Sequence, residues 1–483
     1  MASMSTIVPL CLSILLLFQV SIAQFSFSGN PLYSSREFRG DLASQHQCRF
    51  EHLAALEVTH RERSEAGFIE YYNTETRNEF RCAGVSVRRL VIENMGLALP
   101  VYANAHKLLY IIQGHGVFGM ALPGCPETFQ SVWSAFEQQM AMVGDAQSST
   151  QKLSDEHQQL HKFRQGDVIA VPAGVALWLY NNGDSTVVAF SVIDFGNNAN
   201  QLDPIPREFF LAGKPRSRQQ EQYSYQAEQQ SNNQNIFAGF NPDLLAEALG
   251  VKSSKVSKHC ILLCEEQSQA YLPSQQQQPT WSQRDRGCVQ NYGLNDIMCA
   301  FKLSKNINNA QSTDIFNPRG GRITRANSQN FPVLTIIQMS ATRTVLQSNA
   351  LLTPHWTVNA HTVMYVTTGQ GRIQVVDHRG RTVFDGELRQ QQILLIPQNF
   401  AVAVKARQEG FSWVSFKTSH NAIDSQIAGK ESILRALPVD VVAKAYLLSR
   451  EESRSLKFNR GDEMVVFAPR PHQQLYAEWQ NSK

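Results

Sequence analysis

The chain has 483 residues, of which 42% are hydrophobic and 18% are charged. This composition is typical of a globular protein with a substantial core and excludes a mainly disordered chain. The length predicts two or three domains rather than one. The net charge of +3 is small for this size, so neither nucleic acid nor an anionic membrane is predicted as a partner.

The N-terminus carries the pattern of a signal peptide. Residues 7–20 are apolar, a stretch of signal-core length that is too short to span a bilayer comfortably. Small residues precede the bond between Ala23 and Gln24, so we predict that residues 1–23 are removed there. No later run is apolar and long enough for a membrane span. The mature protein is therefore expected to be soluble and to enter the secretory pathway.

Seven cysteines remain after this cleavage, and in a secretory compartment they can form disulfides. They are Cys48, Cys82, Cys125, Cys260, Cys264, Cys288 and Cys299. Because seven is odd, at least one thiol is free or pairs between chains. Their spacing alone does not determine the connectivity.

The same sequence unit occurs twice along the chain. NAHKLLYIIQGHG from residue 104 matches NAHTVMYVTTGQG from residue 359. FRQGDVIAVPAGVALWLYNN from residue 163 likewise matches LRQQQILLIPQNFAVAVKA from residue 388. A polar insertion rich in Gln and Ser, at about residues 123–163, accounts for the different spacing in the first copy.

Each copy predicts strands followed by a helix. KLLYIIQG and TVMYVTTG are apolar, β-branched runs that end at Gly, while VIAVP and ILLIP end at Pro. Many short strands separated by turns favour an antiparallel sandwich or barrel in each copy. Asn241-Pro242 and Gly250 bound a helix after the first copy, and Pro438 opens one over residues 439–453 after the second.

Two segments are predicted to be surface loops or disordered. Residues 214–234 and 267–286 are rich in Gln, Asn and Ser, and they have too few apolar residues to offset their ordering entropy. Charge also changes along the chain. Residues 24–291 carry 22 Lys and Arg against 27 Asp and Glu, whereas residues 292–483 carry 22 against 14. An acidic part is thus followed by a basic part.

These blocks resemble the 11S seed storage globulins, or legumins, and among them the cereal glutelins. The resemblance covers essentially the whole mature chain and rests on HQCRFEHL, FRCAGVSV, YIIQGHGVFGMALPGCPETFQ, GDVIAVPAGVALWLYN, NYGLNDIMCAFKL, TPHWTVNAHTVMYV and LIPQNFAVAVKA, in this order. It implies an all-β chain with appended helices: two tandem cupin (jelly-roll) β-barrels, each followed by a small helical segment. The expected units are a first cupin domain at 24–250, a variable polar linker at 251–291 and a second cupin domain at 292–483.

The resemblance also implies a function and a maturation route. The function is a non-enzymatic nitrogen and amino-acid reserve in the protein storage vacuole of seed endosperm, assembled as trimers and hexamers, alone or with related globulins. The implied disulfides are Cys48–Cys82 and Cys125–Cys299. An Asn-specific vacuolar protease would cut the chain into acidic and basic parts that the second disulfide links. Tyr292 interrupts the usual Asn-Gly pair here, so we predict a cut after Asn291, with Asn295-Asp296 as the alternative.

Cupin enzymes hold a divalent metal with three His and one Glu at fixed positions. Alignment on Gly114 places other residues there in the first copy: Pro100, Tyr102, Lys107 and Leu177. Alignment on Gly369 gives the second set: His355, Thr357, Thr362 and Val402. One imidazole and two hydroxyls do not make a tight divalent site. We therefore predict no catalytic residue, metal or cofactor, with His355 a vestigial ligand position.

Two functions other than storage are compatible with a cupin fold. A metal-dependent bicupin oxidoreductase or decarboxylase would require a ligand set of which the sequence offers one residue, His355. A carbohydrate-binding module could instead stack a sugar on Trp178 and Trp356, although tryptophans of this kind are more often buried in a core or an interface.

Overall fold

The computed structural model describes residues 48, 50–127, 129–130, 156–201, 205–213, 235–253, 270–271, 284–285 and 296–469. All of them belong to one compact unit, residues 38–483. Several predicted features lie outside the described residues: the signal peptide with the Ala23–Gln24 bond, Asn291 and Tyr292, segment 214–234, most of segment 267–286, and Cys260, Cys264 and Cys288. Among the described helices, none is long and apolar enough to cross a membrane.

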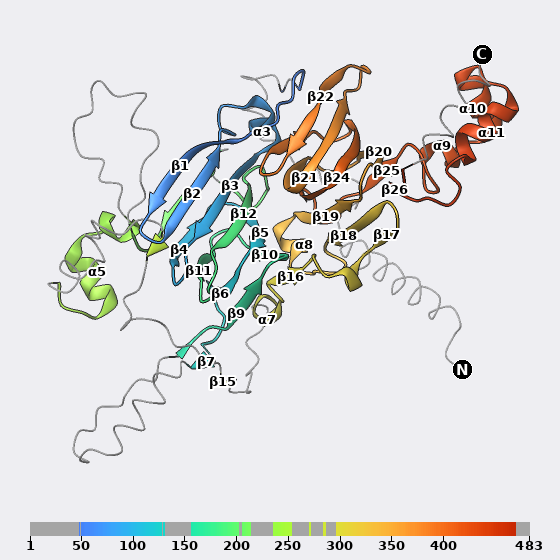
Figure 1. Cartoon of the computed structure of the whole chain (residues 1–483). Coiled ribbons are helices and arrows are strands. Elements are labelled where there is room, and N and C mark those ends of the chain that lie inside the picture. The colour runs from blue at the N-terminus through green and yellow to red at the C-terminus, as the bar shows by residue number, and fades with distance from the viewer. Residues whose placement is uncertain are drawn as a thin grey trace, which may run out of the picture. The chain divides into compact units, whose positions relative to one another are not determined.

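Two antiparallel sheets form the first barrel, drawn mainly in blue and green in Figure 1. The first sheet has the order β1 (Val58–Ser64), β2 (Gly67–Tyr72), β3 (Val85–Ile92), β12 (Val187–Asp194), β5 (His106–Gln113), β10 (Asp167–Val171) and β16 (Ser304–Asn306). The second has the order β13 (Glu208–Phe210), β4 (Leu97–Ala103), β11 (Ala176–Tyr180), β6 (His115–Ala121) and β9 (Leu160–Arg164), with β14 (Ala270–Tyr271) also pairing β4. A third, small sheet comprises β15 (Arg284–Asp285), β7 (Phe129–Gln130) and β8 (Glu156–His157).

A single ten-stranded sheet forms the second barrel, coloured yellow to red in Figure 1. Its main path is β17 (Ile315–Asn317), β18 (Gly321–Ala326), β19 (Ser340–Leu346), β24 (Ala401–Lys417), β20 (Leu351–Thr357) and β25 (Asp424–Gln426). Branching from it are β21 (Thr362–Val376), β22 (Thr382–Arg389), β23 (Ile393–Ile396) and β26 (Val466–Phe467). The all-β architecture with two cupin barrels is thus confirmed.

Glycine ends the repeated strand in the first copy but not in the second. β5 stops before Gly114, as predicted, whereas β21 continues through Gly369 to Val376 with register shifts on both sides of that residue. A Cβ at Gly369 would lie 2.2 Å from the carbonyl oxygen of Gly410. Glycine therefore allows two strands to approach closely while the sheet bends, and the prediction that it ends the strand was wrong there.

The predicted helix after the first barrel is α5 (Pro242–Leu249), in which the Asn241 side chain caps the first turn and Gly250 adopts a left-handed conformation after the last. The single helix predicted over residues 439–453 is wrong. It is divided into α10 (Val439–Tyr446) and α11 (Arg450–Phe458), preceded by the short α9 (Ile433–Ala436). Leu447 adopts a left-handed conformation, and Ser449 starts α11 with a capping box to Glu452.

The remaining helices are short and lie between strands. They are α3 (Asn78–Ala83), η1 (Ile236–Gly239), α7 (Asp296–Ala300), η4 (Ala310–Ser312) and α8 (Leu334–Ile337).

One hydrophobic cluster spans both barrels, and a separate cluster fills the second barrel. The ring of Phe190 on β12 stacks against Tyr365 on β21 with centroids 4.2 Å apart, and it also packs against Phe416 on β24. The hydroxyl of Tyr72 donates a 2.8 Å hydrogen bond to the carbonyl oxygen of Gln391. Large buried aromatic side chains therefore stabilise the contact between the two halves, through both buried apolar area and ring contacts.

Each half of the chain also contributes a segment that pairs with a strand of the other half. β16, which the sequence places after the predicted cut, pairs with β10 at the edge of the first barrel's sheet. In return, Leu56 forms a β-bridge with Ile393 of the second barrel. Two disulfides add covalent links: Cys48–Cys82, with Cα atoms 5.7 Å apart, and Cys125–Cys299, with Cα atoms 5.5 Å apart. These are the two pairs that the resemblance implied.

Candidate functional site in the barrel interiors

The second barrel encloses a small cavity at the place where a cupin enzyme binds its metal. The four residues that the sequence assigned to ligand positions all line it: His355, Thr357, Thr362 and Val402. The cavity measures about 50 Å³, enough for a few water molecules. Pockets for drug-sized ligands measure about 300–1,000 Å³, so this interior is too small for such a ligand.

The first barrel contains a matching cavity of about 50 Å³, but the sequence alignment misplaced two of its residues. Lys107 and Leu177 line it as expected, whereas Pro100 and Tyr102 do not. Val101 pairs with Leu177 just as His355 pairs with Val402 in the other barrel. Alignment on Gly114 was therefore one residue out of step along β4, and in a strand such a slip exchanges the two faces.

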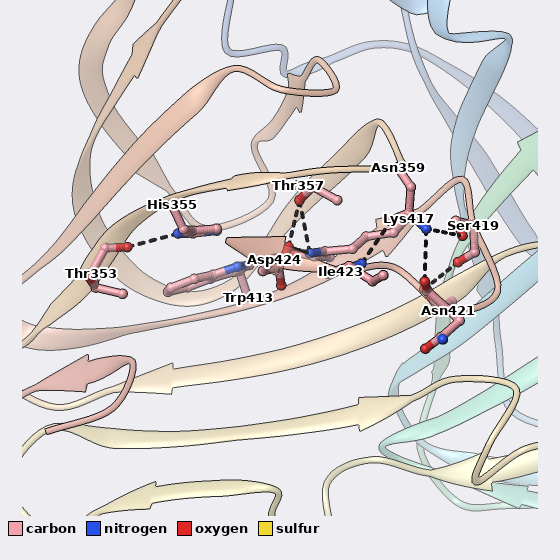
Figure 2. Close-up of polar contacts among 12 residues, drawn as sticks. Thr353, His355, Thr357, Asn359, Trp413, Lys417, Ser419, Asn421, Ile423 and Asp424 are labelled. Carbon is pink, nitrogen blue, oxygen red and sulfur yellow. Dashed lines mark hydrogen bonds and ion pairs between the residues drawn. The ribbon is translucent and has the colours of Figure 1, made fainter. Parts of the chain in front are cut away.

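A buried ion pair between Lys417 and Asp424, drawn in Figure 2, lines the second cavity. Lys417 on β24 is bonded to the carboxylate of Asp424 on β25, and its Nζ lies 3.1 Å from Thr357 Oγ1. Thr357 in turn donates a 2.7 Å hydrogen bond to Asp424 Oδ1. Burial alone would raise the pKa of Asp424, but the neighbouring Lys417 holds it well below its usual range. Asp424 is therefore ionised at any physiological pH.

His355 lies in the same cavity as a neutral imidazole. Its Nδ1 is 2.9 Å from the carbonyl oxygen of Thr353, so Nδ1 carries the proton and Nε2 is the acceptor. Burial lowers the pKa of His355 and Lys417 acts in the same direction, whereas Asp424 opposes them. The ligand that the sequence recognised is thus present and correctly oriented, but a lysine ammonium group shares its cavity.

The first cavity holds a different set of charges around the equivalent carboxylate. Glu208 on β13 pairs with Ala103 of β4, as Asp424 pairs with Thr357 of β20. Both oxygens of Glu208 are bonded by the guanidinium of Arg88, and Lys107 Nζ lies 2.8 Å from Oε1. Burial would raise the pKa of Glu208, but these two cations lower it to about 2.

Sequence reasoning missed most of these charged residues, because they lie outside the two-part metal signature. Arg88 on β3 and Lys417 on β24 each lie in a strand rich in apolar residues, and a charge on the inward face of such a strand was the available signal. Glu208 and Asp424 lie on three-residue strands that carry no recognisable periodicity. Only the sheet pairing shows that these carboxylates enter the barrels.

Both interiors are unsuited to a divalent cation. Each cavity is lined by two cations and one carboxylate: Arg88, Lys107 and Glu208 in the first, and Arg325, Lys417 and Asp424 in the second. The resulting positive charge opposes metal binding. Nowhere in the described part of the chain do three or more His, Cys, Asp or Glu side chains gather as a metal site. Trp178 and Trp356 line neither cavity, so they form no sugar platform at either one.

Two jelly-roll barrels in one chain, each with the remnants of a metal position, define a bicupin. The family model described as "Cupin" matches residues 54–217 and 305–454. The chain is 46% identical over 484 residues to glutelin type-B 1 of Oryza sativa subsp. japonica, covering 96% of this chain and 95% of the relative. It is 45% identical over 474 residues to cocosin 1 of Cocos nucifera, covering 96% of this chain and 98% of the relative.

Solved structures agree with these relatives. The crystal structure of the coconut allergen cocosin matches with a TM-score of 0.72 and 45% identity, over 88% of this chain and all of that one. Pumpkin seed globulin matches with a TM-score of 0.73 and 39% identity, over the same shares. The chain therefore belongs to the cupin family, among the 11S seed storage globulins. It is a seed storage protein and not an enzyme, and nothing supports the oxidoreductase alternative.

Proposed function

We propose that this storage globulin accumulates in the protein storage vacuole as a ring of three protomers, and as a hexamer of two rings, after a cut at Asn291. The observation that carries the proposal is the exposure of apolar side chains on the helices after each barrel. On α5, Leu244 is 59% exposed, and between α10 and α11 Leu447 is 92% exposed. Other apolar side chains are exposed beside them: Phe240, Leu249, Val251, Val441, Tyr446, Leu456 and Phe458.

These two apolar faces differ in sequence and shape, which favours contact between unlike faces of neighbouring copies. Such heterologous contacts form a closed ring when the rotation between neighbours closes. Covering apolar area is worth about 25 cal/mol per Å², so the exposed helices provide a driving force for association. Dense packing of this kind suits a protein whose function is to be stored.

The assembly is tested by size-exclusion chromatography with light scattering of the mature protein. Leu244→Glu and Leu447→Glu each place a charge in one apolar face, and we expect both to yield protomers where the wild type gives trimers or hexamers. Phe316→Glu is the control, because the exposure of Phe316, at 69%, lies between those of Leu244 and Leu447, but Phe316 lies on strand β17. Wild-type protomers, or trimers that persist in both helix variants, would contradict the proposal.

Processing after Asn291 is supported by the contacts on both sides of that residue. Cys125 and Cys299 join the parts of the chain before and after it. The later part also enters the first barrel: Leu303 and Ile307 are buried in the core, and Asn306 Nδ2 donates a 2.8 Å hydrogen bond to Asp167 Oδ1. We infer that the acidic and basic parts remain together after a cut, through strand pairing as well as the disulfide.

This inference is tested by cutting the protein with an Asn-specific protease and reducing it under native conditions. We expect a new N-terminus at Tyr292 and co-elution of both parts after reduction, with separation only in denaturant. Asn291→Gln should prevent the cut. A new N-terminus at Asp296 would favour the alternative site, and parts that separate on native reduction would show that the disulfide alone joins them.

A further inference from the structure

We propose that the cavity of the first barrel binds one small monovalent carboxylate, of the size of formate or acetate, between Lys107 and the hydroxyl of Ser191. The proposal goes beyond storage and does not depend on oligomerisation or processing. It rests on three features of the cavity: its charge, an unused hydroxyl group and its size.

The charge inside the first barrel is not balanced. Arg88 and Lys107 both line the cavity and share the single carboxylate of Glu208. Arg88 engages both oxygens of Glu208, so Lys107 is the cation with capacity to spare: an ammonium group has three donors, and the structure gives Lys107 one bond, to Glu208. Glu62 also acts electrostatically on Arg88, but it does not line the cavity.

A buried charge of this kind is costly unless it is paired. Lys107 is 3% exposed, and burial lowers its pKa while Glu208 acts in the opposite direction. An anion in the cavity would compensate the second cation and keep Lys107 protonated. Binding of an anion is therefore favoured by the same electrostatics that disfavours a metal ion.

Ser191 provides a second donor that faces the same space. It lies on β12, directly opposite Arg88 on β3 and Leu109 on β5, and it lines the cavity. On β5, Lys107 is two residues from Leu109 and therefore a diagonal neighbour of Ser191, within reach of a long side chain. Ser191 is 2% exposed, and its Oγ makes no hydrogen bond to any residue that the structure describes. Buried hydroxyls of this kind are normally satisfied.

The volume of the first cavity and the residues that line it restrict which anions can bind there. The rest of the wall is largely aliphatic, formed by residues such as Leu90, Leu99, Val101, Leu109, Leu177 and Leu179. The volume of about 50 Å³ accommodates a few heavy atoms. A carboxylate on hydrogen or a methyl group matches both the polar and the apolar parts of this wall, whereas an aromatic acid exceeds it.

The second barrel provides a natural control, because its equivalent hydroxyl is already engaged. Ser415 pairs with Thr342 on β19 as Ser191 pairs with Arg88 on β3. Ser415 Oγ accepts a 3.1 Å hydrogen bond from the indole nitrogen of Trp413. Lys417 is bonded to both Asp424 and Thr357. Although Arg325 adds a second cation there as well, no unused buried hydroxyl converges on it among the residues described.

The test is calorimetric titration of the full-length mature protein with sodium acetate at constant ionic strength, together with ¹³C-acetate line broadening. We expect saturable binding to the first barrel. Ser191→Ala should weaken it tenfold or more, because a hydrogen bond to a charged group is lost, and Lys107→Met should abolish it. Ser415→Ala is the matched control and should leave the affinity unchanged.

A flat titration of the wild-type protein overturns the proposal without any variant. Equal weakening by Ser191→Ala and Ser415→Ala, or unchanged binding in Lys107→Met, would also overturn it, because binding would then lie elsewhere. Circular dichroism of each variant establishes that it is folded before titration. Propionate and benzoate extend the series, and the size argument requires that benzoate does not bind.

Discussion

The two barrels have the same fold but neutralise their interior carboxylates with cations from different strands. Glu208 and Asp424 occupy equivalent places on β13 and β25. In the first barrel the cations come from β3 and β5, as Arg88 and Lys107, whereas in the second the bonded cation is Lys417 on β24. The fold thus determines where a carboxylate enters the barrel, but any inward-facing position nearby can supply the cation.

This difference also changes how strongly each carboxylate is held. Glu208 has a bidentate arginine and a lysine, so it retains a partner when either one is removed. Asp424 has one cation bonded to it, with Thr357 as a neutral partner. The first interior is therefore robust toward loss of a cation and sensitive to loss of its carboxylate. The second interior is sensitive to the loss of either charge.

The largest expected effect is that of Glu208→Gln, which leaves Arg88 and Lys107 buried without an anion. Removing one member of a buried charge pair typically costs about 3–5 kcal/mol, and this variant leaves two cations unpaired, so we expect the upper end. Urea denaturation at fixed protein concentration measures it. Asp424→Asn leaves one bonded cation, Lys417, without its carboxylate and should cost less; the reverse order would refute the comparison of the barrels.

Removal of a lysine should destabilise the protein more in the second barrel than in the first, which is the reverse of the order expected for removal of the carboxylates. Lys417→Met leaves Asp424 buried without its bonded cation and should lower the free energy of unfolding by about 3 kcal/mol. Lys107→Met leaves Glu208 paired with Arg88 and should cost about 1 kcal/mol. The same denaturation experiment gives both values, and equal losses would show that Arg88 does not hold Glu208 by itself. Lys417→Met combined with Asp424→Leu should recover much of the loss.

A third prediction concerns pH and the histidine that lies at the start of the first repeated strand in both copies, His106 at the first residue of β5 and His361 just before β21. His106 Nδ1 accepts a 2.9 Å hydrogen bond from the backbone N–H of Ala173, and His361 Nδ1 accepts one from Gln398 at 3.2 Å. Burial lowers the pKa of His106 to about 4. Between pH 4 and about pH 6.5, the unfolded chain binds more protons at this histidine than the folded protein does. The contribution of the uncharged, buried His106 to the free energy of unfolding is therefore complete above about pH 6.5 and is lost as the pH falls toward 4.

The corresponding loss is about 2 kcal/mol between pH 7 and pH 5. His106→Asn preserves an acceptor for Ala173 without the titration, so its stability should depend less on pH by that amount. Thermal unfolding of the wild type and this variant across the range measures the difference. The pKa of Glu208 is lowered from 4.5 to about 2, so its contribution to stability is lost mainly as the pH falls from about 4.5 toward 2 and adds little between pH 7 and pH 5. Identical pH profiles would contradict the assignment, and His361→Asn tests the same contact in the second barrel.

The smallest effect is expected at the shared core, where equivalent arginines differ in their partners. Arg89 on β3 is bonded to Glu70 through Nη1, and only its Nε is buried without a hydrogen bond to described residues, whereas both Nε and Nη1 of Arg343 on β19 lack one. Arg343→Met should therefore change stability by less than about 1 kcal/mol, in the stabilising direction, because it removes unsatisfied donors. Arg89→Met should destabilise by about 1–2 kcal/mol. A larger loss for Arg343→Met would reveal a partner for its guanidinium.

Local patterns in the chain were enough to predict the repeat, two strands in each copy and the starts of α5 and α10. β10 ends before Pro172, β23 ends before Pro397, and α5 has the cap residues that its sequence indicates. These features depend on a few adjacent residues, whose backbone preferences act over one or two turns or one strand. The division of residues 439–453 into α10 and α11 was missed, because the apolar pattern continues while Leu447 and Ser449 interrupt the backbone.

The set of side chains that meet inside each barrel depends on contacts between residues far apart in the sequence, and no local sequence pattern predicts such contacts. His355 was identified because it lies in a known ligand spacing, but its neighbours Lys417 and Asp424 are 62 and 69 residues away and meet it only through sheet pairing. The slip along β4, which exchanged Pro100 for Val101 in the first cavity, has the same origin. Side chains alternate along a strand, so only the register between strands decides which ones enter the barrel and which charges meet there.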